Sequence, residues 1–140
     1  MENILCISSR LHPGVSSVFI NMQKVGLCTH LYLEDIPEPD DFSEWKLVIL
    51  GAWVNEYNER IKKIRITSKV GILITSSIGQ IEQTNYMELQ QLQEILNHLD
   101  NKLIDFVFVG CKNLYEVLKQ DKIKFFPYPI YIHSEEQHDI

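Results

Sequence analysis

The residues best suited to chemistry follow the first apolar segment of the chain. Arg10, His12 and Gly14 stand between the serine pairs 8–9 and 16–17. A Gly- and Ser-containing loop that leads into a helix offers free backbone N–H groups, and the helix dipole there favours a phosphate or a carboxylate. The segment therefore predicts an anion site, although it matches neither GxGxxG nor the P-loop pattern. The alternative is that these residues only begin and cap a helix.

Two further polar segments follow apolar runs. Trp53 comes after the run 46–51, and its ring is suited to stacking on a sugar or a base, although an aromatic residue there is also typical of a core. In the second segment Gly79 allows close approach to the backbone, and hydroxyl, amide and carboxylate groups suited to hydroxyl-rich ligands come from Ser76, Ser77, Gln80 and Glu82. The alternative for this second segment is a loop whose side chains satisfy its own backbone.

The sequence does not favour metal, disulfide or hydrolase chemistry. No histidine stands at metal-ligand spacing from a Cys, Asp or Glu, and no GxSxG motif occurs. The three cysteines, Cys6, Cys28 and Cys111, lie far apart and form no CxxC pair. An odd count without such spacing argues against a disulfide framework and a zinc site. We therefore expect reduced thiols, no metal and no cofactor.

Size and charge restrict the class of protein. The 140 residues, 45% hydrophobic and 23% charged, are typical of one globular domain. A net charge of −6 argues against a nucleic-acid-binding protein. The apolar runs are too short for a transmembrane segment and no signal peptide precedes them, so we expect a cytoplasmic protein. Five basic residues between Arg60 and Lys69 suit an anionic lipid or a phosphorylated acceptor, or simply form a solvated helix face.

The elements that must position these residues alternate between strands and helices. Short apolar runs predict strands at 3–8, 27–33, 46–50, 70–75, 104–109 and 123–126. Amphipathic spacing predicts helices at 13–25, 57–66, 85–99 and 112–120, and Val15, Val18, Phe19, Met22 and Val25 form the inward face of the first. Apolar strands separated by helices predict an α/β fold: a single doubly wound, mostly parallel, Rossmann-like sheet with helices on both faces. Ligands of such sheets bind beyond the carboxyl ends of the strands.

Several segments resemble the N-terminal domain of GT-B glycosyltransferases. His12–Leu27 is similar to their glycine-containing first loop, first helix and K-x-G turn. Gly71–Gln80, followed by Glu88, resembles their fourth-strand loop and helix. Ile104–Cys111 resembles the strand before the switch between domains, and Phe126–Ile130 resembles the P-x-P segment that ends the N-terminal domain. The resemblance implies one half of a GT-B fold, the acceptor-side domain, over residues 1–132. Residues 133–140 are polar and are expected to form a tail.

The resemblance also implies a function. Such enzymes transfer a sugar from a nucleotide-sugar to an acceptor glycan or small molecule. The first-loop role carries over to Gly14, and less directly to His12 and Val15, which would contact the donor diphosphate or the acceptor. The acceptor-cleft role carries over to residues 76, 77, 79 and 80, and His12 and Glu82 are the candidates for a catalytic base. The family's donor-binding second domain has no counterpart in these residues, so activity would need a second domain or a partner chain.

Two other functions stay open. The same fold suits a non-catalytic module that binds a nucleotide or a sugar. It also suits a protein-interaction module, such as a homodimer that pairs through the aromatic residues Phe125, Phe126, Tyr128 and Tyr131. A transferase or binding site predicts that loops 10–16 and 75–82 meet at one cleft, whereas an interaction module predicts a large apolar surface patch.

Overall fold

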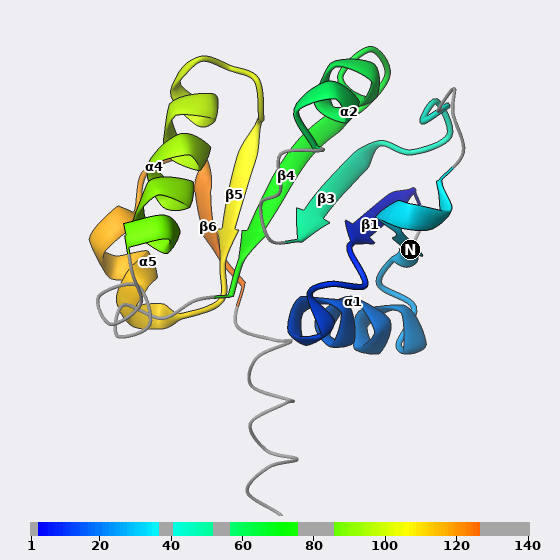
Figure 1. Ribbon diagram of the computed structural model, residues 1–140, viewed down its shortest axis with the longest axis horizontal. Coiled ribbons are helices and arrows are strands. Elements are labelled where there is room, and N and C mark those ends of the chain that lie inside the picture. Colours follow the sequence, from blue (N-terminus) through cyan, green and yellow to red (C-terminus); the bar gives the residue numbers. More distant parts are fainter. Residues whose placement is uncertain (1–2, 37–40, 52–56, 76–85, 127–140) are drawn as a thin grey trace, which may run out of the picture.

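The protein is built on one parallel sheet (Figure 1). The computed structural model describes residues 3–36, 41–51, 57–75 and 86–126. The strands are β1 (Ile4–Ser8), β2 (Thr29–Tyr32), β3 (Leu47–Gly51), β4 (Lys69–Ile74), β5 (Phe106–Val109) and β6 (Ile123–Phe125). The helices are α1 (Pro13–Lys24), the short 3-10 helix η1 (Leu33–Asp35), α2 (Tyr57–Ile64), α4 (Tyr86–Asp100) and α5 (Lys112–Leu118). The predicted α/β class, with helices between parallel strands, is confirmed.

The strand order decides where a ligand can bind. The sheet runs β2-β1-β3-β4-β5-β6, and every strand pair is parallel. β2 lies on one side of β1 and β3 on the other, so the direction of winding reverses between β1 and β3. The first five strands follow the flavodoxin-like order rather than the order 3-2-1-4-5-6 of dinucleotide-binding domains. In both orders the ligand lies at this reversal, called the switch point, beyond the carboxyl ends of the strands.

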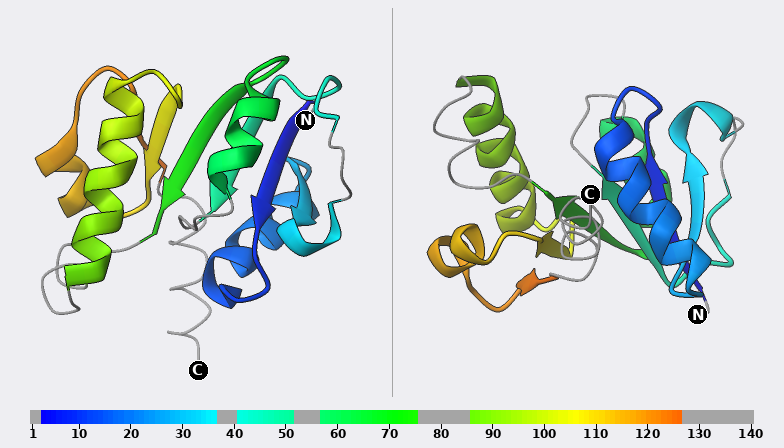
Figure 2. Two further views of the ribbon diagram at one scale, coloured as in Figure 1. Left: turned by 45° about the horizontal axis from the view of Figure 1, so that its top comes forward. Right: turned by 90° about the horizontal axis from the view of Figure 1, so that it is seen from below.

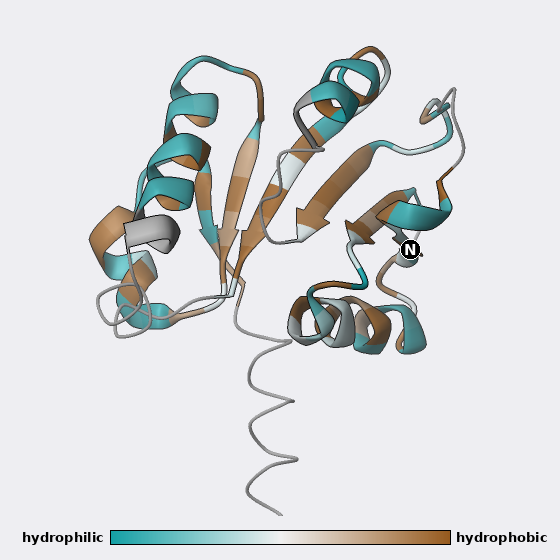
Figure 3. Ribbon diagram, viewed as in Figure 1, coloured by the Kyte–Doolittle hydropathy of each residue, from teal (hydrophilic) through white to brown (hydrophobic). Residues whose placement is uncertain are grey.

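The two faces of the sheet carry separate apolar clusters because successive strand residues point to opposite sides. Leu5 and Ile7 of β1 belong to the larger cluster, together with Ile61 of α2 and Ile95 of α4. Cys6, between them, belongs to the smaller cluster under α1. Helix α1 lies beside the β1–β3 half of the sheet, whereas α4 and α5 lie beside the β5–β6 half (Figures 1 and 2). The strands are mainly hydrophobic and the helices mix both kinds of residue (Figure 3), as expected for an amphipathic layer on a buried sheet.

A glycine lets α1 lie close to the end of β3. A Cβ at Gly51 would stand 2.6 Å from the Phe19 ring and 2.7 Å from a Val15 methyl group. Such distances are far inside van der Waals contact, so any larger residue would push α1 away from the sheet. This close packing brings the first turn of α1 to the carboxyl edge of β1 and β3.

The end of α1 corrects one prediction. Val15, Val18, Phe19 and Met22 are buried as predicted, but Val25 is 58% exposed. Val25 is the residue after the last helical turn, and the chain turns away at Gly26, whose φ of +82° is a left-handed conformation that favours glycine. The local turn therefore overrides the helical spacing that placed Val25 on the inward face.

The second strand is shorter than predicted. It spans four residues rather than 27–33, and Leu33 lies in η1. The strand is at the edge of the sheet, so its residues alternate between exposed and half-buried. Its early end brings the acidic residues of η1 close to the loop after β1.

Among the described residues no helix is long and apolar enough to cross a membrane.

Candidate functional site

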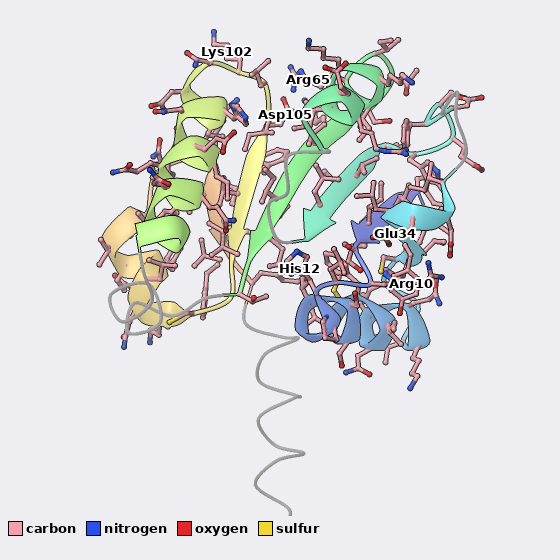
Figure 4. The ribbon with its side chains drawn as sticks, in the orientation of Figure 1. Arg10, His12, Glu34, Arg65, Lys102 and Asp105 are labelled. Carbon is pink, nitrogen blue, oxygen red and sulfur yellow. The ribbon has the colours of Figure 1, made fainter. Side chains whose placement is uncertain are left out.

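The candidate site is the connection between β1 and α1 at the switch point (Figure 4). His12 is the N-cap residue of α1, and its side chain makes no capping hydrogen bond to this helix end. Pro13 has no N–H group, and neither Gly14 nor Val15 donates a hydrogen bond from its backbone within the described residues. These two N–H groups belong to the first turn, which has no intrahelical acceptor. They are the donors that an anion at the site would use.

The approach to these donors is open. Gly14 is exposed, and a Cβ built on it would meet nothing within 4 Å. A ligand can therefore come close to the backbone at Gly14 without moving any described atom. Val15 differs, because its side chain is buried between α1 and the sheet, and only its N–H group faces the helix end.

A carboxylate of η1, the short helix that follows β2, holds the loop after β1. The Ser9 hydroxyl donates a hydrogen bond to Oε2 of Glu34 at 2.5 Å, and the Arg10 N–H donates to Oε1 at 3.1 Å. The Ser9 hydroxyl oxygen also accepts from the Leu11 N–H at 3.1 Å. The hydrogen bond from Ser9, and then the one from Arg10, lower the pKa of Glu34. The carboxylate of Glu34 is therefore ionised at neutral pH and lies beside the site.

Arg10 is engaged by η1 rather than by the helix end. Its guanidinium donates to both carboxylate oxygens of Asp35, at 2.9 and 2.6 Å, and lies over the Tyr32 ring at 4.3 Å from the centroid. The hydrogen bond with Arg10 lowers the pKa of Asp35, and the same contact raises the pKa of Arg10. An anionic ligand that uses the Arg10 side chain must therefore compete with Asp35.

A buried polar cluster lies under the loop. The Ser8 hydroxyl is 2.8 Å from the Ser16 hydroxyl and 2.8 Å from Nε2 of His30. The Ser16 hydroxyl donates to the Ser9 carbonyl at 3.1 Å. Ser8, Ser9 and Ser16 are the three buried polar residues of the described chain, between 0% and 3% exposed. Burial lowers the pKa of His30, so its ring is neutral at neutral pH.

The structure brings four of the predicted site residues together. Arg10, His12, Gly14 and Val15 lie in one loop and the helix turn that follows it. The other predicted site residues, Trp53, Ser76, Ser77, Gly79, Gln80 and Glu82, lie outside the described residues. Whether loops 10–16 and 75–82 meet therefore stays a prediction, as do the catalytic roles of His12 and Glu82.

Three residues of the site were not predicted from the sequence. Glu34, Asp35 and His30 reach the loop from β2 and η1, far from it in sequence. For Glu34 a signal existed: an acidic residue just after the second strand, twenty residues beyond Gly14, is the usual place for the group that accepts a ribose hydroxyl. His30 has no such signal, because only the register of β2 beside β1 brings it to Ser8.

Other charged and aromatic predictions have local explanations. Arg65, from the predicted basic cluster, donates to Asp105 at 2.9 Å at the opposite edge of the sheet from His12 (Figure 4). Phe125 and Phe126, from the predicted dimer surface, have ring contacts within the chain, with Tyr115 at 5.5 Å and Phe108 at 5.9 Å. An anionic partner of the basic cluster and a homodimer through the aromatic residues both stay predictions.

Comparison with known proteins adds no assignment to this geometry. No protein-family model matches the sequence, and no curated protein matches it significantly. In the part of the chain described, no group of three or more His, Cys, Asp or Glu residues is placed to hold a metal ion.

Proposed function

We propose that this chain is a nucleotide-binding α/β domain, with its ligand at the carboxyl edge of β1 and β3. The observation that carries the proposal is the open first turn of α1 at the switch point, where Gly14 and Val15 present N–H groups and Gly14 leaves room for close approach. A phosphate is the group that such a helix end favours. This function corresponds to the non-catalytic binding module of the sequence analysis.

The charges around the loop restrict the chemical class of the ligand. Arg10 is neutralised by Asp35, so among the described residues of the loop and η1 the charge of the Glu34 carboxylate has no side-chain cation as its partner. Each Glu34 oxygen accepts one hydrogen bond from the loop and has a second lone pair to offer. This side suits hydroxyl donors, such as those of a ribose, and repels a second phosphate. The proposed ligand therefore has its phosphate at α1 and its sugar hydroxyls toward Glu34.

The experiment is a thermal-shift series with UDP, GDP, UDP-glucose, GDP-mannose and inorganic phosphate at constant ionic strength. A ligand that binds only the folded state adds about 2.7 kcal/mol to the free energy of unfolding when its concentration is a hundred times Kd. Tm rises as a consequence. We expect shifts with the nucleotides and their loss in Gly14→Val, which fills the open space at the helix end. Lys24→Val, an exposed position at the other end of α1, is the matched control and keeps the shift. No shift with any nucleotide contradicts the proposal.

The acceptor-side domain of a GT-B glycosyltransferase is a second, more specific candidate. What supports it is the segment His12–Leu27, whose loop, helix and glycine turn at Gly26 match what the resemblance implies. This candidate predicts that simple glycans also raise Tm and that Gln80→Ala abolishes that shift. A nucleotide shift without a glycan shift favours the binding module instead.

A further inference from the structure

The buried cluster under the loop is a chain of four polar groups. Nε2 of His30 lies 2.8 Å from the Ser8 hydroxyl, which lies 2.8 Å from the Ser16 hydroxyl, which lies 3.1 Å from the Ser9 carbonyl oxygen. All three serines are fully or almost fully buried. At such depth the arrangement that puts a hydrogen into all three contacts is favoured, because each further buried hydrogen bond contributes about 0.5–1.5 kcal/mol.

Counting hydrogens gives the chain a direction. A serine hydroxyl has one hydrogen, and a carbonyl oxygen can only accept. The Ser16 hydrogen is therefore used on the Ser9 carbonyl. The Ser8 hydrogen must then lie between Ser8 and Ser16, since otherwise two hydroxyl oxygens would face each other at 2.8 Å with no hydrogen between them. Ser8 has no hydrogen left for His30, so the hydrogen of that contact belongs to Nε2 of His30.

We propose that His30 is a positioning residue for the switch-point site, whose Nε2–H group starts a one-way chain of hydrogen bonds that ends on the Ser9 carbonyl and holds the β1–α1 loop in place. The inference rests on the proposed function, because the loop that it fixes presents the first turn of α1. The Ser9 carbonyl also accepts from the N–H group of His12, the N-cap residue, at 3.0 Å. The end of the chain and the start of the helix therefore share one atom.

The ring of His30 is itself held in position. Its backbone N–H donates to Oε1 of Gln23 at 2.7 Å, which ties β2 to α1. Tyr32 meets the ring edge-on, with 4.7 Å between the centroids, and Phe19 lies at 6.1 Å. These contacts orient Nε2 toward Ser8. The Glu34 carboxylate holds the Ser9 hydroxyl at the same time, so Ser9 is fixed through both its carbonyl and its side chain.

The direction of the chain also excludes another role for the pair. A Ser–His nucleophile needs a histidine nitrogen that accepts the serine hydrogen. Here Nε2 donates, the Ser8 hydroxyl donates onward to Ser16, and Ser8 is 0% exposed. The chain ends on a carbonyl that cannot pass a proton on. Its role is therefore to hold the loop and not to act on a substrate.

The first test is the tautomer of His30, measured by ¹⁵N NMR of the whole chain at a pH where the ring is neutral. We expect the hydrogen on Nε2, with slow exchange of that hydrogen with water. In Ser16→Ala the Ser8 hydrogen is released from Ser16 and can turn to His30, so the Nδ1–H form is expected to appear. A role in packing alone would not link a helix residue to the tautomer of a ring that it does not touch. Finding Nδ1–H in the unmodified protein, or no change in Ser16→Ala, overturns the proposal.

The second test measures the loop itself, through hydrogen exchange of the His12 amide. His30→Gln keeps an N–H donor close to the place of Nε2, whereas His30→Leu removes it. We expect faster exchange in His30→Leu and in Ser16→Ala, and near-normal exchange in His30→Gln. Equal exchange in the Gln and Leu variants contradicts the positioning role. Both tests are made without a ligand, so a failure to bind UDP in the thermal-shift series contradicts the proposed function and leaves this inference standing.

Discussion

Two glycines of the sheet matter because they lack a side chain. Gly51 lies against Phe19 and Val15 of α1, and Gly71 lies under Phe108, whose ring carbon would be 2.5 Å from an added Cβ. Phe19 and Val15 are buried and Phe108 is half-buried, so none of these side chains can turn freely away. The two positions therefore allow close packing of a helix and of a ring on the sheet.

Gly51→Ala is expected to lower the free energy of unfolding by roughly 1–3 kcal/mol, because the new methyl group overpacks the space beside Phe19. Urea unfolding followed by circular dichroism measures the change. Gly14→Ala is the matched control, since its Cβ meets nothing within 4 Å, and it is expected to be neutral or stabilising by up to about 1 kcal/mol. Equal destabilisation of the two variants would contradict the packing of α1 against β3.

His30 makes stability depend on pH. Burial lowers its pKa in the folded protein, so the unfolded chain takes up a proton more readily. The contribution of the neutral ring is complete above the unfolded-state pKa of about 6.5 and decreases as the pH falls below that value. We expect the free energy of unfolding to fall between pH 7 and 5 more steeply in the unmodified protein than in His30→Gln. Parallel pH profiles for the two proteins would show that His30 is not the group responsible.

At the scale of elements, the β1–α1 loop is held from two sides. The His30–Ser8–Ser16 chain reaches it from β2 and α1, and the acidic pair of η1 reaches it from beyond β2. The two supports come from different elements, so a substitution can remove one of them and leave the contacts of the other unchanged. Both side chains of the ion pair Arg10–Asp35 are exposed to solvent, so the pair contributes little to the stability of the fold.

Asp35→Asn tests what that pair does. The change removes the charge that neutralises Arg10 and leaves the size of the side chain unchanged. Tm without ligand is expected to stay almost constant, whereas affinity for UDP is expected to rise as the guanidinium becomes available to a phosphate. Isothermal titration at low and high salt measures the effect, which should weaken at high salt. An unchanged affinity would show that Arg10 lies out of reach of the ligand.

At the scale of the whole molecule, the carboxyl and the amino ends of the strands carry different groups of polar residues. The carboxyl edge carries the candidate site, and the amino edge carries the ion pair of Arg65 and Asp105 (Figure 4). Oδ2 of Asp105 accepts from Arg65 at 2.9 Å and from the N–H group of Val70 at 2.9 Å. Val70 is fully buried, so Asp105 satisfies a backbone donor that has no water in reach.

Asp105→Ala is therefore expected to cost about 1–3 kcal/mol of stability, the usual cost of leaving a buried donor unmet. Because the change lies at the opposite edge from α1, affinity for a nucleotide is expected to stay unchanged at temperatures where the variant is folded. Chemical unfolding and a binding titration on the same sample separate the two effects. A loss of affinity equal to the loss of stability would show that the two edges are coupled.

Much of the element pattern was predictable, because it depends on neighbours in sequence. The spacing of Val15, Val18, Phe19 and Met22 predicted the buried face of α1, and the predicted end at residue 25 lies one residue beyond the observed end at Lys24. The helix predicted at 85–99 spans Tyr86–Asp100, and Ile95 and Leu99 on it are buried. Boundaries were less exact at β2 and at Val25, where edge exposure and a turn compete with periodicity.

The order of the strands and the environment of the site came only from the tertiary structure. Periodicity within a segment says that a strand is apolar on both faces, and this is enough to predict a parallel sheet between helices. It does not say which strands are neighbours, and so it could not place β1 between β2 and β3. That placement brings His30 to Ser8, Glu34 to Ser9 and Asp35 to Arg10, over separations of 22 to 25 residues. The chemistry of the loop depends on these partners, and only the paired strands bring them within hydrogen-bonding distance.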